Sequence, residues 1–139
     1  MPGVNITGGC HCREITYEGV LDPEKVGICH CADCQALSAS AFRTIGIVAG
    51  NAFKLLKGTP KTYIKVGDSG NRRVQAFCSN CGSGLYATDE GENPKAYNVR
   101  LGTVDQRSTL SPTFECWRQS ALPWLASNEE TKKFDQNPE

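Results

Sequence analysis

The sequence has no long apolar run, no surplus of charge and no recognisable export signal. Its apolar stretches fall short of the roughly 18 residues that a membrane-spanning helix needs, so we expect no membrane segment. Fifteen basic side chains balance fifteen acidic ones. Nucleic acids and acidic membranes bind to basic surfaces, so we expect neither as a partner. The first residues lack the charged and then apolar build of a signal peptide, which predicts a cytoplasmic protein.

The length of 139 residues fits a single domain with a substantial core. We expect that domain to span residues 1–126, followed by a polar tail at 127–139 that frays. Short helical turns are predicted at residues 22–26 and 33–39. Glycine- and asparagine-rich turns separate strand-like runs at residues 13–18, 42–48, 53–56, 62–66, 73–77, 85–88, 96–101 and 113–118. This spacing predicts a mainly β fold of short antiparallel sheets.

The sequence contains eight cysteines, and seven of them fall into three tight clusters. In a reducing cytoplasm, clustered cysteines bind metal more often than they form disulfides. A disulfide within Cys-x-Cys or Cys-x-x-Cys also closes a very small ring, which is seldom structural. The clusters are Cys10 with Cys12, Cys29 with Cys31 and Cys34, and Cys78 with Cys81.

The two cysteine pairs are complementary halves of one closed, four-cysteine zinc site. Cys10 and Cys12 lie near the N-terminus, and Cys78 and Cys81 lie far along the chain. A metal clip that closes so long a loop can stabilise a fold strongly. Gly82 follows the second pair and tolerates the positive φ that a zinc-knuckle turn often requires. We expect this zinc to be structural.

The triplet of Cys29, Cys31 and Cys34 then forms a second site. Residues two apart on extended backbone point the same way, and a turn over the next two residues can bring Cys34 to the same point. Three protein ligands are the number that catalytic zinc sites use, with a fourth position open to water or substrate. The alternatives are His30 as a fourth ligand, an iron–sulfur cluster, and adventitious or no metal.

Several other residues receive weaker predictions. Cys116 is expected to be a small buried hydrophobe, and His11 and His30 to lie outside the metal coordination. Residues close enough in sequence to line a pocket at the triplet are Gln35, Ser38 and Phe42. Cations that could bind an anionic thiol are Lys61, Arg72, Arg73 and Arg100, although solvated charge explains each equally well.

The chemistry of such an open site favours a thiol. Zinc bound to three thiolates is a modest Lewis acid for water, but it can hold an incoming thiol as thiolate. A thiolate held beside an aldehyde is a nucleophile placed for addition. The residues therefore indicate thiol–carbonyl chemistry, without identifying the thiol.

Three blocks of this sequence resemble the signature blocks of the glutathione-dependent formaldehyde-activating enzyme family, which includes centromere protein V. The blocks begin at Gly9, at Cys29 and at Phe77, and read GCHC, CHCADC and FCSNCGS. The connecting segments KGTPKTY, LGTVD and LPWL are similar too, so that the resemblance extends from about Gly8 to Leu125. One departure is that Ser38 is followed by Ala39, where the family often has a Ser-Gly pair.

The resemblance implies a β-tent fold with two zinc ions per chain, one structural and one catalytic. The structural ligands carry over to Cys10, Cys12, Cys78 and Cys81, and the catalytic ligands to Cys29, Cys31 and Cys34. The implied activity is that of a carbon–sulfur lyase that forms S-(hydroxymethyl)glutathione from glutathione and formaldehyde. A non-catalytic, zinc-stabilised binding module is the main alternative, and a thiol or metal sensor is a third.

Overall fold

The computed structural model describes residues 3–126 and 128–138. Within these ranges nine strands form one sheet, in the order β4-β5-β6-β7-β3-β2-β8-β9, and β1 pairs with β2. The strands are β1 (Val4–Gly9), β2 (Thr16–Cys29), β3 (Arg43–Lys57), β4 (Lys61–Val66), β5 (Arg72–Phe77), β6 (Gly84–Asp89), β7 (Ala96–Arg100), β8 (Phe114–Cys116) and β9 (Lys132–Lys133). The helix α1 covers Ala32–Ser38, and three 3₁₀ turns cover Leu101–Thr103, Arg107–Thr109 and Arg118–Ser120.

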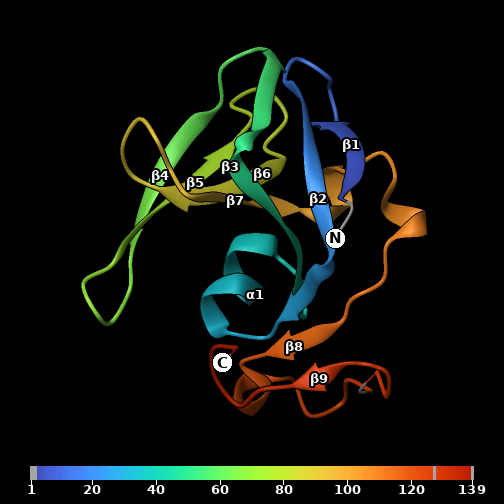
Figure 1. Ribbon diagram of the computed structural model, residues 1–139. Helices are drawn as coiled ribbons and strands as arrows, with labels where there is room; N and C mark the ends of the chain where they lie inside the picture. The colour runs from blue at the N-terminus through green and yellow to red at the C-terminus, as the bar shows by residue number, and fades with distance from the viewer. Residues whose placement is uncertain (1–2, 127, 139) are drawn as a thin grey trace.

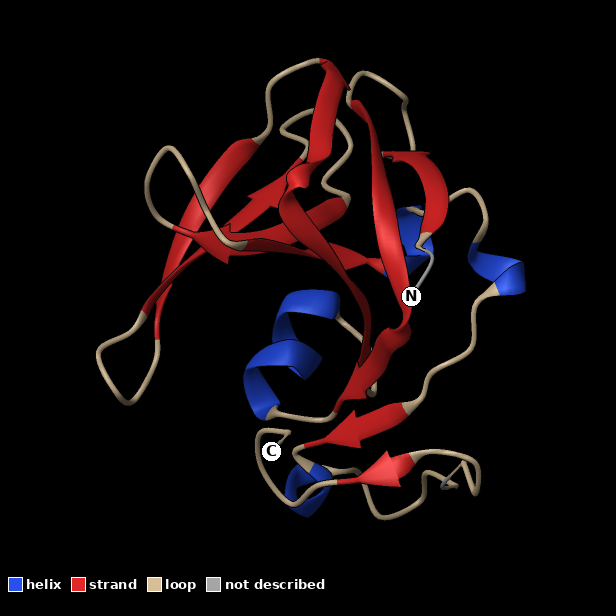
Figure 2. Cartoon of the chain, in the orientation of Figure 1, coloured by secondary structure: helices blue, strands red, loops and turns tan. Residues whose placement is uncertain are grey.

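The sheet is strongly bent, so that the chain has a tent-like upper part and a smaller lower part (Figure 1). The long strands β2 and β3 connect the two parts, and β4 to β7 form one side of the upper part. The lower part holds α1, β8 and β9 (Figure 2). The prediction of a mainly β fold with one or two short helices is therefore confirmed.

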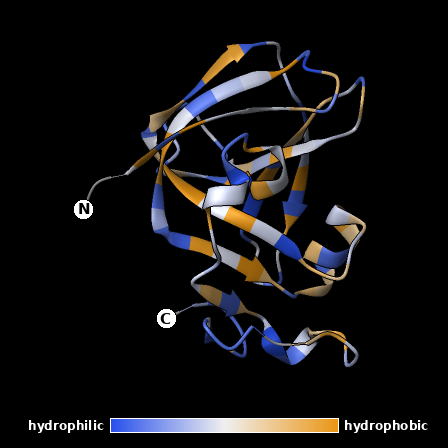
Figure 3. Cartoon of the chain, turned by 90° about the vertical axis from the view of Figure 1, so that its right-hand side faces the viewer, coloured by the Kyte–Doolittle hydropathy of each residue, from blue (hydrophilic) through white to orange (hydrophobic). Residues whose placement is uncertain are grey.

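The core lies inside the upper part, where the inner faces of the strands meet. Tyr17, Leu21, Val48, Leu85 and Val99 are fully buried there. Polar and apolar residues are mixed along the strands (Figure 3), as expected where one face of a sheet packs and the other meets solvent. This core positions the strand ends that carry the cysteines.

An aromatic cluster joins the two sides of the core. Phe53 stacks on Tyr17 and Tyr97, with ring centroids 5.4 and 4.2 Å apart, and meets the edge of Tyr86 at 5.1 Å. Aromatic pairs at these separations stabilise a core beyond the area they bury. The cluster ties β2, β3, β6 and β7 together.

The predicted helical turn at residues 22–26 is wrong, because this segment belongs to β2. The register of β2 against β3 shifts from Leu21–Val48 to Val26–Gly46, which marks a bulge. Within the bulge Asp22 Oδ1 accepts a hydrogen bond from the backbone N–H of Glu24. Leu21 and Val26, on either side of it, are both fully buried. Tertiary burial of the flanking residues therefore keeps the Asp-Pro segment in the strand.

The predicted turn between the runs at 42–48 and 53–56 is also wrong, since β3 continues through Gly50 without interruption. A Cβ at Gly50 would lie 1.9 Å from the carbonyl oxygen of Pro94, so glycine is needed for close approach of the two backbones. The Gly50 N–H donates to the Lys95 carbonyl at 2.8 Å. A glycine that resembles a turn signal in the sequence thus serves strand packing.

The C-terminal residues that the sequence predicts to fray are docked in part. β9 pairs in parallel with β8, which itself pairs in parallel with the end of β2. Thr131 beside β9 is only 7% exposed. These parallel pairs were not predicted, because an antiparallel arrangement was expected throughout. The division between 1–126 and 127–139 stays a prediction, although the docked strand argues against a free tail.

No helix in residues 3–126 or 128–138 has the length and apolar character needed to cross a membrane.

Candidate metal centres

The four-cysteine group is assembled from two turns that are distant in sequence. Cys10 and Cys12 lie in the turn after β1, and Cys78 and Cys81 in the turn between β5 and β6. All four sulfur atoms lie within 4.8 Å of one another. The backbone at Cys10–Cys12 is a turn, which the Arg13 N–H closes by donating to the Cys10 carbonyl. Arg13 there takes a positive φ of 64°.

The sulfur separations in this group suit a tetrahedral ion and exclude a disulfide. Cys12 Sγ lies 3.6 Å from Cys10 Sγ and 3.7 Å from Cys78 Sγ. A zinc–sulfur bond of about 2.3 Å in tetrahedral geometry places sulfurs about 3.8 Å apart, whereas a disulfide needs about 2.05 Å. The donor set and its spacing therefore fit a closed zinc site.

Backbone and hydroxyl hydrogen bonds to the sulfurs favour their ionised forms, while burial and the neighbouring thiols of Cys81 and Cys10 raise the pKa of Cys78 to about 11. The N–H groups of Ile15 and Cys81 donate to the sulfurs of Cys10 and Cys78 at 3.4 and 3.5 Å. The Ser83 hydroxyl lies 3.3 Å from Cys81 Sγ, and its hydrogen bond lowers the pKa of Cys81 to about 5. A deprotonated thiol is the form that binds metal.

The triplet is held by the junction of β2 and α1. Cys29 ends β2, and Cys31 has extended backbone and forms the N-cap of α1. The first turn of α1 brings the N–H of Cys34 to 3.2 Å from Cys31 Sγ. The three sulfurs lie within 4.8 Å of one another, as the extended-then-turn prediction requires. Hydrogen bonds from Cys29 and Cys34 lower the pKa of Cys31.

The triplet forms part of the wall of a cavity of about 740 Å³. That volume is within the usual range for small-molecule sites. Arg73 and Arg100, two of the four predicted cations, line it, whereas Lys61 and Arg72 do not. The predicted pocket residues Gln35, Ser38 and Phe42 are also absent from its lining. Within α1, Cys34 lines the cavity, whereas Gln35 and Ser38 do not.

The sequence reasoning missed several cavity residues. Arg43 pairs with Cys29 in the register of β2 and β3, and Cys116 pairs with Cys29 in the register of β2 and β8. Cys116 is buried, as predicted, but it lies beside the triplet in the same cavity wall. Lys65 and Phe134 reach the cavity from β4 and from the C-terminal segment. Only strand pairing brings them there, so no local motif signals them.

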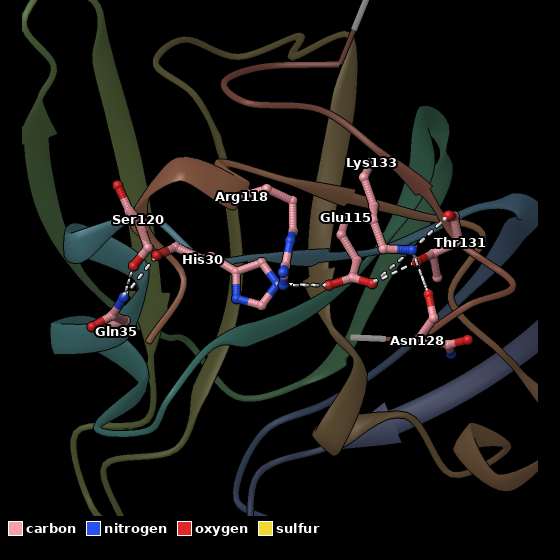
Figure 4. Close-up of polar contacts among 8 residues, drawn as sticks. All are labelled: His30, Gln35, Glu115, Arg118, Ser120, Asn128, Thr131 and Lys133. Carbon is pink, nitrogen blue, oxygen red and sulfur yellow. Dashed lines mark hydrogen bonds and ion pairs between the residues drawn. The ribbon is translucent and has the colours of Figure 1, made fainter. Parts of the chain in front are cut away.

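His30 belongs to a buried polar network with Glu115 (Figure 4). It is 1% exposed, and its Nε2 lies 2.8 Å from Oε1 of Glu115, which is 2% exposed. The other carboxylate oxygen of Glu115 accepts from the Thr131 hydroxyl. Hydrogen bonding by Thr131 and His30 outweighs burial and lowers the pKa of Glu115. His30 is thus no member of the sulfur group, whereas His11 is exposed.

Gln35 has a backbone role in the same region (Figure 4). Its Nε2 donates to the carbonyl oxygens of His30 at 2.8 Å and Ser120 at 3.0 Å. It therefore fastens the cysteine loop to the 3₁₀ turn that follows β8.

Comparison with known proteins gives this geometry a context. The sequence pattern described as glutathione-dependent formaldehyde-activating enzyme matches residues 5–120. The chain belongs to this family. The matched segment contains all eight cysteines and both sulfur groups.

Two curated relatives of this family member come from fungi. An uncharacterized lyase from Schizosaccharomyces pombe is 27% identical over 95 residues, which cover 68% of this chain and 66% of the relative. A protein from Colletotrichum graminicola, provisionally named glutathione-dependent formaldehyde-activating enzyme, is 26% identical over 125 residues, or 85% of this chain and 64% of the relative. The chain thus spans just under two thirds of either relative.

A crystal structure of a Rhodobacter sphaeroides protein has a similar fold. The TM-score is 0.56 at 18% sequence identity, and the match covers 71% of this chain and 87% of that one. At this identity the likeness concerns the fold alone.

Proposed function

We propose that this chain is a zinc-dependent carbon–sulfur lyase that adds a thiol, glutathione or a similar molecule, to formaldehyde or another small aldehyde. Family membership supports the lyase class and the formaldehyde- and glutathione-related chemistry. The observation that carries the proposal is the group of three sulfurs in the wall of a cavity large enough for such a thiol. A binding module would not require sulfurs to line a cavity.

In this proposal the triplet holds the catalytic metal. Cys29, Cys31 and Cys34 supply three sulfur ligands, which is the ligand number of catalytic zinc sites. A zinc ion bound there would supply the positive charge that keeps an incoming thiol deprotonated near neutral pH. The cavity walls hold the thiol substrate beside the aldehyde, so that proximity provides much of the rate.

The addition needs no external oxidant or reductant. The thiolate sulfur forms a bond to the carbonyl carbon, and the π electron pair of the carbonyl moves to its oxygen. That oxygen takes up a proton in place of the one that the thiol lost. The reverse sequence releases the aldehyde, which makes the reaction a reversible carbon–sulfur lyase step.

The four-cysteine group is proposed to hold a second, structural zinc. Cys10, Cys12, Cys78 and Cys81 would enclose that ion with four sulfurs and leave no position for a substrate. Its role would be to fasten the turn after β1 to the turn between β5 and β6.

Metal analysis and cobalt spectroscopy test the proposal together. Protein purified without added metal is expected to contain two zinc ions per chain, and glutathione is expected to change the visible spectrum of cobalt in the triplet. The protein is also expected to accelerate formation of S-(hydroxymethyl)glutathione from formaldehyde. A single zinc per chain, or a cobalt spectrum unchanged by glutathione, would contradict the glutathione-dependent function.

A further inference from the structure

Of two arginines beside the triplet, one is buried and one is half-buried, and neither has a carboxylate partner in the described part of the chain. Arg43 is 8% exposed and pairs with Cys29 across β2 and β3. Arg100 ends β7 and lines the same cavity. Gln75 lies between them, and its Oε1 accepts from Arg100 Nη2 at 2.7 Å and from Arg43 Nη1 at 3.5 Å. Within residues 3–126 and 128–138, no carboxylate forms an ion pair with either guanidinium.

This arrangement costs free energy as it stands. Two guanidinium groups around one amide oxygen repel each other and have lost much of their hydration. Burial and the charge of Arg43 lower the pKa of Arg100 to about 9. By contrast, Arg73 in the same cavity pairs with Asp89 at 2.7 Å. Each guanidinium has five N–H donors and uses one on Gln75, so donors are left for an anion.

The cavity as a whole is strongly basic. Its charged lining residues, apart from the cysteines, are one acid and six cations, namely Glu24 and Lys25, Arg43, Lys65, Arg73, Arg100 and Lys132. A divalent ion with three thiolates carries about one net negative charge, which a single guanidinium balances. Arg73 and Lys65 are already paired with Asp89 and Asp33. The surplus over that need therefore consists of the second arginine together with Lys25 and Lys132.

The two arginines also stand where two cavities meet. Together with Gln75 they line the cavity of the triplet and a neighbouring one of about 430 Å³. A molecule whose sulfur lies at the triplet can therefore extend along this shared wall to the two guanidinium groups. Planar guanidinium donors match the two oxygens of a carboxylate.

We infer that Arg43 and Arg100 form a carboxylate-binding subsite, and that the substrate thiol carries a carboxylate which this pair recognises. The inference rests on the proposed function for the thiol, but the subsite itself does not depend on the metal. It makes the arginine pair the determinant of specificity for anionic thiols such as glutathione over uncharged ones.

Binding of a blocked thiol tests the subsite without relying on the metal or on turnover. S-methylglutathione keeps its carboxylates but has no free thiol, and its dimethyl ester has lost the carboxylate charge. Both are titrated calorimetrically into the wild-type protein and into Arg100→Gln, Arg100→Lys and Arg72→Gln. Arg72 is the matched control, because it is an exposed cation on β5 that pairs with Glu90 outside the cavity. Thermal melts verify that each variant is folded.

The wild type is expected to bind the carboxylate form at least about tenfold more tightly than the ester. Arg100→Gln is expected to weaken binding of the carboxylate form by about tenfold to a hundredfold. Its binding of the ester should weaken by less than about twofold. Arg100→Lys should bind the carboxylate form with an affinity between those of the wild type and Arg100→Gln. Lysine keeps the positive charge but lacks the paired, planar N–H donors of a guanidinium. Arg72→Gln should match the wild type.

Three results would overturn the inference. The first is that Arg100→Gln weakens binding of the acid and of the ester equally, which would mean that the arginine only balances the charge of the thiolates. The second is an equal effect of Arg72→Gln, and the third is no preference for the acid in the wild type. If acid preference depends on Arg100 in a protein without lyase activity, the proposed function fails and the subsite stands. If the protein has lyase activity but shows no preference for the acid, the proposed function stands and the subsite fails.

Discussion

At the scale of single residues, the cysteines divide into members of sulfur groups and one that only lies nearby. Cys31 is central to the triplet, because it receives the Cys34 N–H and has its pKa lowered by both neighbouring thiols. Cys116 is buried in the same cavity wall, yet it belongs to neither sulfur group. The two therefore form a matched pair for mutation.

Cys31→Ser is expected to lower the zinc content by one ion per chain and to abolish lyase activity, because two sulfurs hold the metal much less well than three. The fold should persist, since the other zinc group is untouched. Elemental analysis, an activity assay and a thermal melt measure the three effects. Cys116→Ser is the control and should retain both ions. Loss of an ion from Cys116→Ser would instead make Cys116 a ligand.

Glu115 is the second residue whose environment makes a sharp prediction. It is 2% exposed and faces His30, Thr131, Arg118 and Lys133. Glu115→Gln removes a buried charge that is hydrogen-bonded and paired, so it should cost about 2 kcal/mol of unfolding free energy near pH 7. Urea denaturation measures this difference.

The pKa of Glu115 is lowered in the folded state, so its ionised form stabilises the fold above its ordinary value of 4.5. This contribution is lost as the pH falls through the lowered pKa. The difference in unfolding free energy between the wild type and Glu115→Gln should therefore narrow below about pH 4.5. Glu129→Gln, at an exposed position, should leave stability unchanged at every pH. A gap independent of pH would contradict the ionised state of Glu115.

At the scale of elements, the helix α1 ends in an unusual way. Its C-cap, Ala39, takes the left-handed conformation with φ 52° and ψ 41°. This position is where the family resemblance leads one to expect glycine. A residue with a Cβ costs about 1–2 kcal/mol in this conformation, whereas glycine adopts it freely. The chain thus keeps the family's helix end with a less suitable residue.

Ala39→Gly is expected to raise the unfolding free energy by about 0.5–1 kcal/mol, because relief of strain exceeds the added entropy of the unfolded chain. Ala36→Gly, within the same helix and also exposed, should lower it by about 1 kcal/mol. Chemical denaturation of both variants measures whether the unfolding free energy rises in the first and falls in the second. Destabilisation by both would show that the helix end is not strained.

At the scale of the whole molecule, the four-cysteine group joins parts that the chain separates widely. Cys12 and Cys78 are 66 positions apart and their sulfurs are 3.7 Å apart. Closing a loop of this length by a cross-link contributes about 4 kcal/mol in the chain-entropy model. That amount is a large share of the 5–15 kcal/mol typical of a domain.

Cys78→Ser is therefore expected to lower the melting temperature by about 10–15 °C, and a chelator should have a smaller effect on this variant than on the wild type. Cys31→Ser should shift the melting temperature far less. Calorimetry with and without chelator compares them. Equal shifts in the two variants would contradict the division into one structural and one catalytic site.

The sequence by itself determined the short-range features: the mainly β class, most of the strands and the division of seven cysteines into two groups. Local patterning sets the strands and the three cysteine clusters, because residues one to three positions apart have few possible arrangements. The joining of the two distant cysteine pairs follows instead from the four ligands that a closed zinc site needs. The structure assembles the same two groups, while their metal-binding roles stay predictions. The bulge in β2 could not be foreseen, because burial of Leu21 and Val26 in the core overrode a local turn signal. The unbroken β3 could not be foreseen either, because Gly50 is needed for close approach to the backbone at Pro94.

Only the tertiary structure decided what surrounds the triplet. Arg43, Arg100 and Cys116 come to the cavity through strand pairing, and Glu115 meets His30 across 85 positions of sequence. The docking of β9 on β8 depends on the same long-range pairing. No local pattern encodes these contacts, because the register between distant strands is set by the packing of the whole sheet.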